Sequence, residues 1–135
     1  MSDSDWMKRC EELGSEARAA GNSAVGSVIV SKNLLIAEAF EEVESLHDLS
    51  AHAEALAIKS ATRTLQKNDL SGCALYTNVE PCWMCSYLIR ESKISRVVIG
   101  KEVDGIGGVT SSFPILTTTH NSDWSVEPEI VWLRD

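Results

Sequence analysis

The sequence predicts an α/β fold, a three-layer α/β/α sandwich around one mixed five-stranded sheet. Two observations predict it. Apolar segments with strand character alternate with segments whose apolar residues recur every three or four positions, which favours helices on both faces of a sheet. The length of 135 residues suits one sizeable core, and we expect residues 1–135 to form a single domain.

The elements follow from periodicity and from local start and stop signals. In chain order we expect a helix at 5–20, strands at 25–31 and 34–40, a helix at 51–65, a strand at 73–79, a helix at 81–92, and strands at 96–100 and 129–133. Lys32 and Asn33 favour a tight turn, so the first two strands should pair antiparallel, and the later strands should run parallel. Ser50 is a candidate helix cap, and Pro81 is typical of a first helical position. A short helical turn is expected near 113–118.

Charge and hydropathy narrow the classes of function. Acidic residues exceed basic residues by 20 to 12, for a net charge of -8. Nucleic-acid binders usually carry a basic footprint, so the charge argues against nucleic acid as a partner and favours a small uncharged or cationic ligand. No apolar run reaches the ~18 residues of a membrane span. The polar start Met1–Asp5 has no secretory pattern, so we expect a cytoplasmic protein without a membrane partner.

The residues with metal chemistry fall at two expected helix starts. Cys82 and Cys85 are three positions apart, hence on one helical face, where the helix dipole favours the thiolates that zinc binds. His52 would add an imidazole nitrogen. Three protein ligands leave the fourth position of a Zn²⁺ ion open, as in catalytic sites. Glu54 is placed to act as a general acid and base beside the metal.

The pattern His-x-Glu followed by Pro-Cys-x-x-Cys is the signature of zinc nucleobase deaminases. The chain carries it at Ala51–Glu54 and Glu80–Cys85, and it resembles the cytidine-deaminase-like superfamily over about Val25 to Gly100. The similar branch holds guanine deaminases, fungal-type cytosine deaminases and bacterial tRNA adenosine deaminases. The resemblance implies His52, Cys82 and Cys85 as zinc ligands, Glu54 as the proton shuttle, and a homodimer or higher homo-oligomer.

One position departs from that branch. Relatives place an asparagine after the second strand, where its amide bonds the bound base, and counting back from His52 without gaps puts Glu41 there. An ionised carboxylate only accepts hydrogen bonds, so Glu41 would favour a ligand with N–H donors. The alternative is a loop slip that leaves Glu41 in solvent.

Several aromatic side chains are candidates for the substrate pocket. Phe40 is a candidate to stack on a base or to pack in the core. Trp83 is a candidate to line the pocket, to shape a subunit interface, or to pack in the core. Trp124 and Trp132 are candidates to close the pocket from the C-terminal segment.

Three functions fit these observations. The first is zinc-dependent hydrolytic deamination of a small aminated heterocycle, such as a free nucleobase, which the acidic charge favours. The second is a tRNA adenosine deaminase that converts adenosine to inosine. The third is a non-catalytic zinc-stabilised scaffold, which the presence of Glu54 argues against.

Overall fold

The computed structural model describes residues 1–121, 123–124 and 126–134. Its elements are α1 (Asp3–Ala19), β1 (Gly26–Ser31), β2 (Leu34–Phe40), α2 (Val43–Leu46), α3 (Ala53–Leu65), β3 (Ala74–Val79), α4 (Trp83–Ser92), β4 (Arg96–Lys101) and β5 (Glu129–Trp132). Within the described ranges, no helix combines the length and apolar composition that a membrane span needs.

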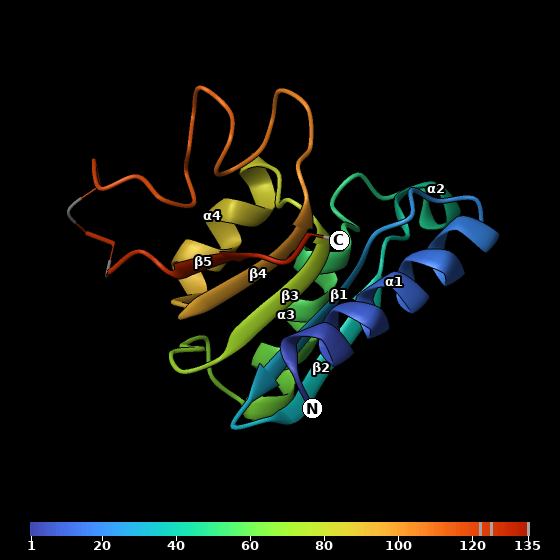
Figure 1. The fold of residues 1–135 in the computed structure, drawn as a ribbon, viewed down its shortest axis with the longest axis horizontal. Helices are drawn as coiled ribbons and strands as arrows, with labels where there is room; N and C mark the ends of the chain where they lie inside the picture. The colour runs from blue at the N-terminus through green and yellow to red at the C-terminus, as the bar shows by residue number, and fades with distance from the viewer. Residues whose placement is uncertain (122, 125, 135) are drawn as a thin grey trace.

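The five strands form one sheet in the order β2-β1-β3-β4-β5. Strand β1 runs antiparallel to both β2 and β3, whereas β4 is parallel to β3 and β5 is parallel to β4. Helix α1 crosses one face, and α3 and α4 cover the other (Figure 1). The predicted mixed five-stranded sheet and the three-layer fold are confirmed.

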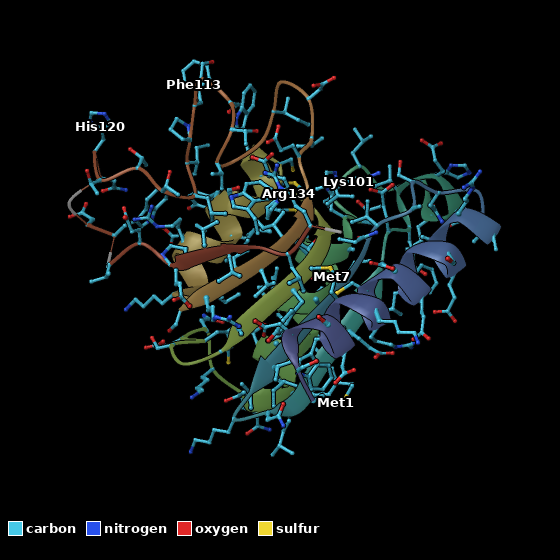
Figure 2. All side chains as sticks on the ribbon, viewed as in Figure 1. Met1, Met7, Lys101, Phe113, His120 and Arg134 are labelled. Carbon is cyan, nitrogen blue, oxygen red and sulfur yellow. The ribbon has the colours of Figure 1, made fainter. Side chains whose placement is uncertain are left out.

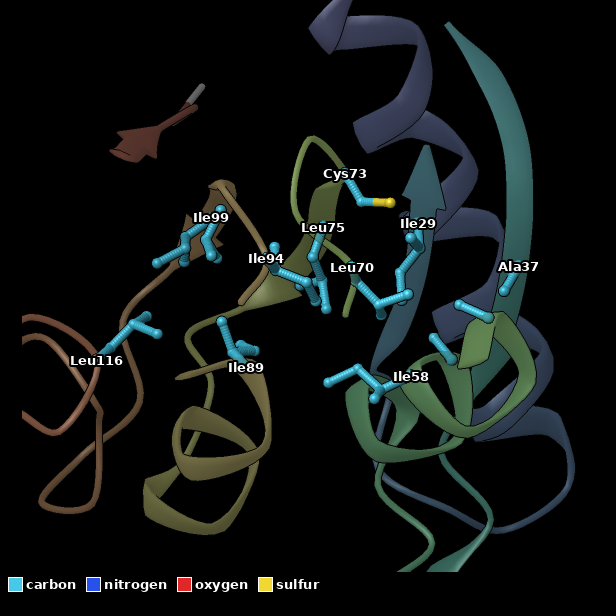
Figure 3. Packing of buried hydrophobic residues seen from close by; sticks show 13 residues of the cluster. Ile29, Ala37, Ile58, Leu70, Cys73, Leu75, Ile89, Ile94, Ile99 and Leu116 are labelled. Carbon is cyan, nitrogen blue, oxygen red and sulfur yellow. The ribbon is translucent and has the colours of Figure 1, made fainter. Parts of the chain in front are cut away.

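Alternation along the strands sends side chains into two separate apolar clusters. On the α1 face, Trp6 and Cys10 pack against Val28 and Tyr76. The larger cluster lies between the sheet and helices α3 and α4. Figure 3 shows it, with labelled members that include Ile29, Leu75 and Ile89. Cys10 and Cys73 are buried in these clusters, as their apolar surroundings predict.

The hairpin between β1 and β2 turns at the predicted position. Lys32 and Asn33 both have positive φ, at 52° and 60°. Two successive left-handed residues match the right-handed twist of the flanking strands. This turn sets the register that pairs Ser31 with Leu34.

Two predicted helix starts are wrong by one turn or less. Helix α3 begins at Ala53 with His52 as its N-cap, because the Ser50 hydroxyl bonds the Asp48 carboxylate at 2.7 Å instead. Helix α4 begins at Trp83 with Cys82 as its N-cap. The Pro81 carbonyl accepts the Gly108 N–H at 2.8 Å, so the bond that would extend the helix back is replaced by a tertiary one.

One further segment differs from the expectation. Residues 43–46 form the one-turn helix α2, where neither a helix nor a strand is predicted from the sequence. Its backbone N–H groups at Glu44 and Ser45 donate to the side chain of Asn22 at 2.9 and 3.0 Å, a partner that local sequence does not reveal. The short helical turn expected near 113–118 is present as an isolated turn, closed by the Thr118 N–H to the Pro114 carbonyl at 2.9 Å.

Candidate metal centre and substrate pocket

The structure brings His52, Cys82 and Cys85 together from two helix starts. Their ligand atoms all lie within 4.8 Å of one another, and His52 Nδ1 lies 3.5 Å from Cys82 Sγ. His52 and Cys82 are the N-cap residues of α3 and α4, and Cys85 lies in the first turn of α4. The sheet holds the two helices side by side, so residues 30 positions apart share one site.

The three side chains are electrostatically coupled, and the contact with Cys82 raises the pKa of Cys85. Hydrogen bonds from Cys85 and His52 lower the pKa of Cys82 to about 4 despite its partial burial. The same contact with Cys82 raises the pKa of His52. Zinc binds thiolate sulfur and imidazole nitrogen, and a three-ligand set is typical of catalytic rather than structural sites. The donor set therefore fits a zinc ion, and His52, Cys82 and Cys85 are positioned to bind it.

Glu54 lies in the first turn of α3, two residues after His52. Its side chain is buried, with 4% exposed. Burial is the largest cause that raises the pKa of Glu54 to about 8, and the nearby Cys82 thiolate adds to it. A buried carboxyl group with a pKa near neutrality, next to a metal centre, has the properties of a general acid and base.

A pocket of about 600 Å³ opens beside the metal centre. It is lined by Ser23, Ala24, Val25, Glu41, His52, Glu54, Val79, Glu80, Cys82, Lys101, Glu102, Val103, Asp104 and Ile106. Glu41 therefore lies in the pocket, and its carboxylate accepts a 3.2 Å hydrogen bond from the Ser23 N–H. That Glu41 contacts a substrate stays a prediction.

The aromatic candidates lie outside the pocket lining. Phe40 packs against the α1-side cluster. The Trp83 indole N–H donates to Ser111 Oγ at 2.9 Å, and its ring meets Phe113 edge-on at 5.6 Å. Phe113 lies at the outer end of the loop after β4 (Figure 2). This arrangement does not test whether Phe40 or Trp83 contacts a substrate. Their role in substrate binding stays a prediction.

The two C-terminal tryptophans also pack elsewhere. The Arg90 guanidinium lies over the Trp124 ring, with its central carbon 4.7 Å from the ring centroid. The indole N–H of Trp124 donates to the Glu91 carboxylate at 2.8 Å. Trp132 packs against the larger apolar cluster. Neither is among the residues that line the pocket.

Sequence reasoning missed one wall of the pocket. No role is predicted from the sequence for residues 102–106, which follow β4, but four of them line the pocket. Glu80 was part of the recognised motif without a role of its own. The available signal was an acidic residue directly before Pro81, at the end of a buried strand where solvent exposure is not expected.

A mixed sheet sandwiched by helices, with a His-Cys-Cys zinc site and a buried carboxyl group at its edge, defines a zinc-dependent hydrolytic deaminase. The family described as the cytidine and deoxycytidylate deaminase zinc-binding region matches residues 1–101. The chain belongs to this family.

Individual relatives carry more specific names. The chain is 43% identical over 111 residues to a tRNA-specific adenosine deaminase of Aquifex aeolicus, covering 80% of this chain and 74% of that one. It is 40% identical over 86 residues to the guanine deaminase of Bacillus subtilis, covering 63% of this chain and 55% of that one. The chain thus spans little more than half of the latter protein.

A solved structure is similar over almost the whole fold. It comes from studies of A-to-I editing by tRNA:A34 deaminases at the wobble position of transfer RNA. Its TM-score is 0.88, with 25% sequence identity, 96% of this chain covered and 98% of that chain.

These relatives overturn the expectation that nucleic acid is not a partner. That expectation rested on the net charge of -8. Net charge sums over the whole surface, whereas binding responds to the local field at the contact. One relative named for action on tRNA is 43% identical to this chain over 111 residues, and a solved structure from studies of tRNA deaminases shares this fold. The net charge of the whole chain was therefore the wrong quantity from which to judge a nucleic-acid partner.

Proposed function

We propose that the protein converts adenosine in an RNA substrate to inosine by hydrolytic deamination, with tRNA as the substrate class. The observation that carries the chemistry is that Glu54, two residues after the ligand candidate His52, lines the same pocket as His52 and Cys82. Similarity to tRNA-specific adenosine deaminases over 80% of the chain supports the choice of substrate.

The residues divide the chemical work. His52, Cys82 and Cys85 would hold the zinc ion, which when bound supplies a Lewis acid that lowers the pKa of water toward ~7. The Glu54 carboxylate accepts a proton from the attacking water and delivers it to the ring nitrogen next to the reacting carbon. Glu54 then accepts the second proton of that water from the newly added hydroxyl group and passes it to the amino group. The C–N bond breaks, ammonia leaves, and the hydroxyl oxygen becomes the carbonyl oxygen.

The pocket supplies the surroundings that such a reaction needs. Its volume of about 600 Å³ lies within the usual range for ligand pockets. Val25, Val79, Val103 and Ile106 provide apolar surface against which the flat faces of a base would pack. Burial of Glu54 keeps its proton exchange directed to the bound ring rather than to bulk water.

Glu41 favours a second candidate, deamination of a free base that carries ring N–H or additional amino donors. Its carboxylate lies in the pocket and can only accept hydrogen bonds when ionised. The ring nitrogens of adenine that stay unprotonated are also acceptors, whereas guanine presents N–H donors. The similarity to a guanine deaminase over 63% of the chain supports the same candidate.

Two probes separate the candidates. The zinc-loaded protein is incubated with an RNA stem–loop that carries an unpaired adenosine and, separately, with free guanine. Inosine formation from the stem–loop supports the first candidate, and xanthine with ammonia from guanine supports the second. No product from either probe, with zinc bound, would refute both and leave a zinc-stabilised scaffold.

A substitution at Glu41 sharpens the comparison. Glu41→Gln adds two N–H donors at nearly constant volume, so we expect inosine formation to rise and guanine turnover to fall, each by about 10-fold. Glu44→Gln is the matched control, because Glu44 is exposed and lies outside the pocket lining. Equal rates for wild type and Glu41→Gln on both probes would show that Glu41 does not select the substrate.

A further inference from the structure

Glu80 is a buried carboxylate at the end of β3, directly before Pro81 and Cys82. Only 2% of the residue is exposed. It accepts hydrogen bonds from the backbone N–H groups of Val103, Val109 and Thr110 at 3.2, 2.9 and 2.8 Å. The Thr110 hydroxyl donates a further bond at 2.7 Å. The negative charge is thus compensated by converging donors from one segment.

That segment, residues 102–110, is called here the wall segment. Its residues Glu102, Val103, Asp104 and Ile106 line the pocket. The bonds to Glu80 enclose this stretch at both ends, since Val103 lies near its start and Val109 and Thr110 at its end. The wall segment has no regular secondary structure, so these side-chain bonds replace the ladder that would fix a strand.

The backbone of the wall segment pairs with the backbone at and next to the ligand candidate Cys82. Gly107 forms an isolated antiparallel bridge with Cys82, and the Gly108 N–H donates to the Pro81 carbonyl at 2.8 Å. A Cβ atom on Gly107 would collide with the Glu80 carboxylate. Any larger residue at Gly107 would therefore displace the Glu80 carboxylate from its present position.

A second part of the pocket lining is bonded to Asn78, two residues earlier on β3. The side-chain oxygen of Asn78 accepts the Gly26 N–H at 2.9 Å, and its amide donates to the Ala24 carbonyl at 2.9 Å. Ala24 and Val79 both line the pocket. Side chains at the end of β3 therefore bond two separate segments that contribute to the pocket.

We propose that Glu80 is a positioning residue, whose carboxylate fixes the wall segment so that Val103 and Ile106 form an apolar surface for the substrate ring. The proposal rests on the function proposed above, in which the pocket holds an aminated heterocycle. Glu80 itself takes no part in proton transfer. A carboxylate is needed because it offers only acceptor sites to four donors, whereas glutamine would turn two N–H groups of its own toward them.

Amide hydrogen exchange in the zinc-loaded protein, measured without a substrate, tests whether the bonds to Glu80 fix the wall segment. Glu80→Gln should speed exchange at Val109 and Thr110 by about 10-fold or more, because each bond to a charged acceptor resists opening. Thr110→Val removes one donor at constant shape and should give a smaller increase in a protein that still folds. Thr119→Val is the matched control, because Thr119 is exposed. Wild-type exchange rates at Val109 in both Glu80→Gln and Thr110→Val would overturn the proposal.

Steady-state kinetics on the RNA stem–loop then separate positioning from general stability. We expect Glu80→Gln to raise KM by about 10-fold with kcat changed by less than about 3-fold, and to retain its zinc. A variant that is merely less folded loses active protein, which lowers the apparent kcat and leaves KM unchanged, and that result would also overturn the proposal. If wild type converts neither probe, the proposed function fails, and hydrogen exchange still decides whether Glu80 holds the wall segment.

Discussion

The Nδ1 atom of His52 lies 3.5 Å from the Sγ atom of Cys82, where the N-terminal ends of α3 and α4 meet. Each residue is the N-cap of its own helix, so the metal centre joins two helices that neighbour each other behind the sheet (Figure 1). His52 and Cys82 would hold a zinc ion there through one ligand from the start of each helix. Metal binding and the stability of this layer are therefore coupled.

Removal of a ligand should abolish zinc binding. His52→Ala or Cys82→Ala leaves two of the three ligands, and we expect zinc affinity to fall by more than about 100-fold, beyond the loss typical of outer-shell changes. Zinc content is measured by elemental analysis after dialysis against a weak chelator. Cys73→Ala is the control, because Cys73 is buried in the larger apolar cluster. Full zinc retention in both ligand variants would refute the assignment.

Cys82 and Cys10 should differ sharply in their reactivity toward alkylating agents in the metal-free protein. The pKa of Cys82 is lowered to about 4 by hydrogen bonds from Cys85 and His52, whereas burial raises the pKa of Cys10 to about 12. The thiolate is the reactive form, so iodoacetamide should modify Cys82 in the metal-free protein well before Cys10. Peptide mass spectrometry follows each site, and zinc-loaded protein should be protected at Cys82. Equal labelling of Cys10 and Cys82 would contradict the expected ionisation.

Acid should weaken the attachment of α1 to the sheet. Arg96 Nη2 lies 2.7 Å from Asp3 Oδ2, and hydrogen bonds from Arg96 and Tyr76 lower the pKa of Asp3 to about 2. Because the folded pKa lies below the ordinary value, the stabilisation is complete above pH ~5 and is lost as pH falls toward ~2. Both partners are about one-third exposed, so the contribution should not exceed about 1 kcal/mol.

The variant Asp3→Asn isolates the contribution of the Asp3–Arg96 ion pair to the free energy of unfolding. The difference in unfolding free energy between wild type and Asp3→Asn is measured in urea at several pH values, so that effects of zinc common to both proteins cancel. It should shrink toward zero as the solution is acidified through the range in which Asp3 protonates. A difference that stays constant with pH would show that the ion pair does not contribute.

The fold could be predicted because its signals are local and periodic. Val28 and Tyr76 point to one face of the sheet and Ile29 and Leu75 to the other. A strand covered on both faces is a short run of apolar residues in the sequence, as at 28–30, and that signal is local. The short spacing of Cys82 and Cys85 likewise carries its geometry with it, since residues three apart on a helix share a face.

The pocket could not be predicted to the same extent, because its walls depend on contacts between distant residues. The hydrogen bonds that Glu80 accepts come from residues 23 to 30 positions further along the chain. No periodic pattern in the sequence indicates such partners. Trp83 points toward Ser111 for the same kind of reason, since only the path of the loop after β4 decides which side chain it meets. The roles of Glu54, Glu41, Phe40 and Trp83, the single domain and the homodimer remain predictions.

The most direct test of the central claim compares the zinc-loaded wild type with Glu54→Gln. Glutamine keeps the shape of the side chain and cannot shuttle a proton, so zinc content should stay the same. Ammonia release from whichever probe the wild type converts should fall by at least about 100-fold. A Glu54→Gln protein that holds zinc and releases ammonia at the wild-type rate would contradict the account.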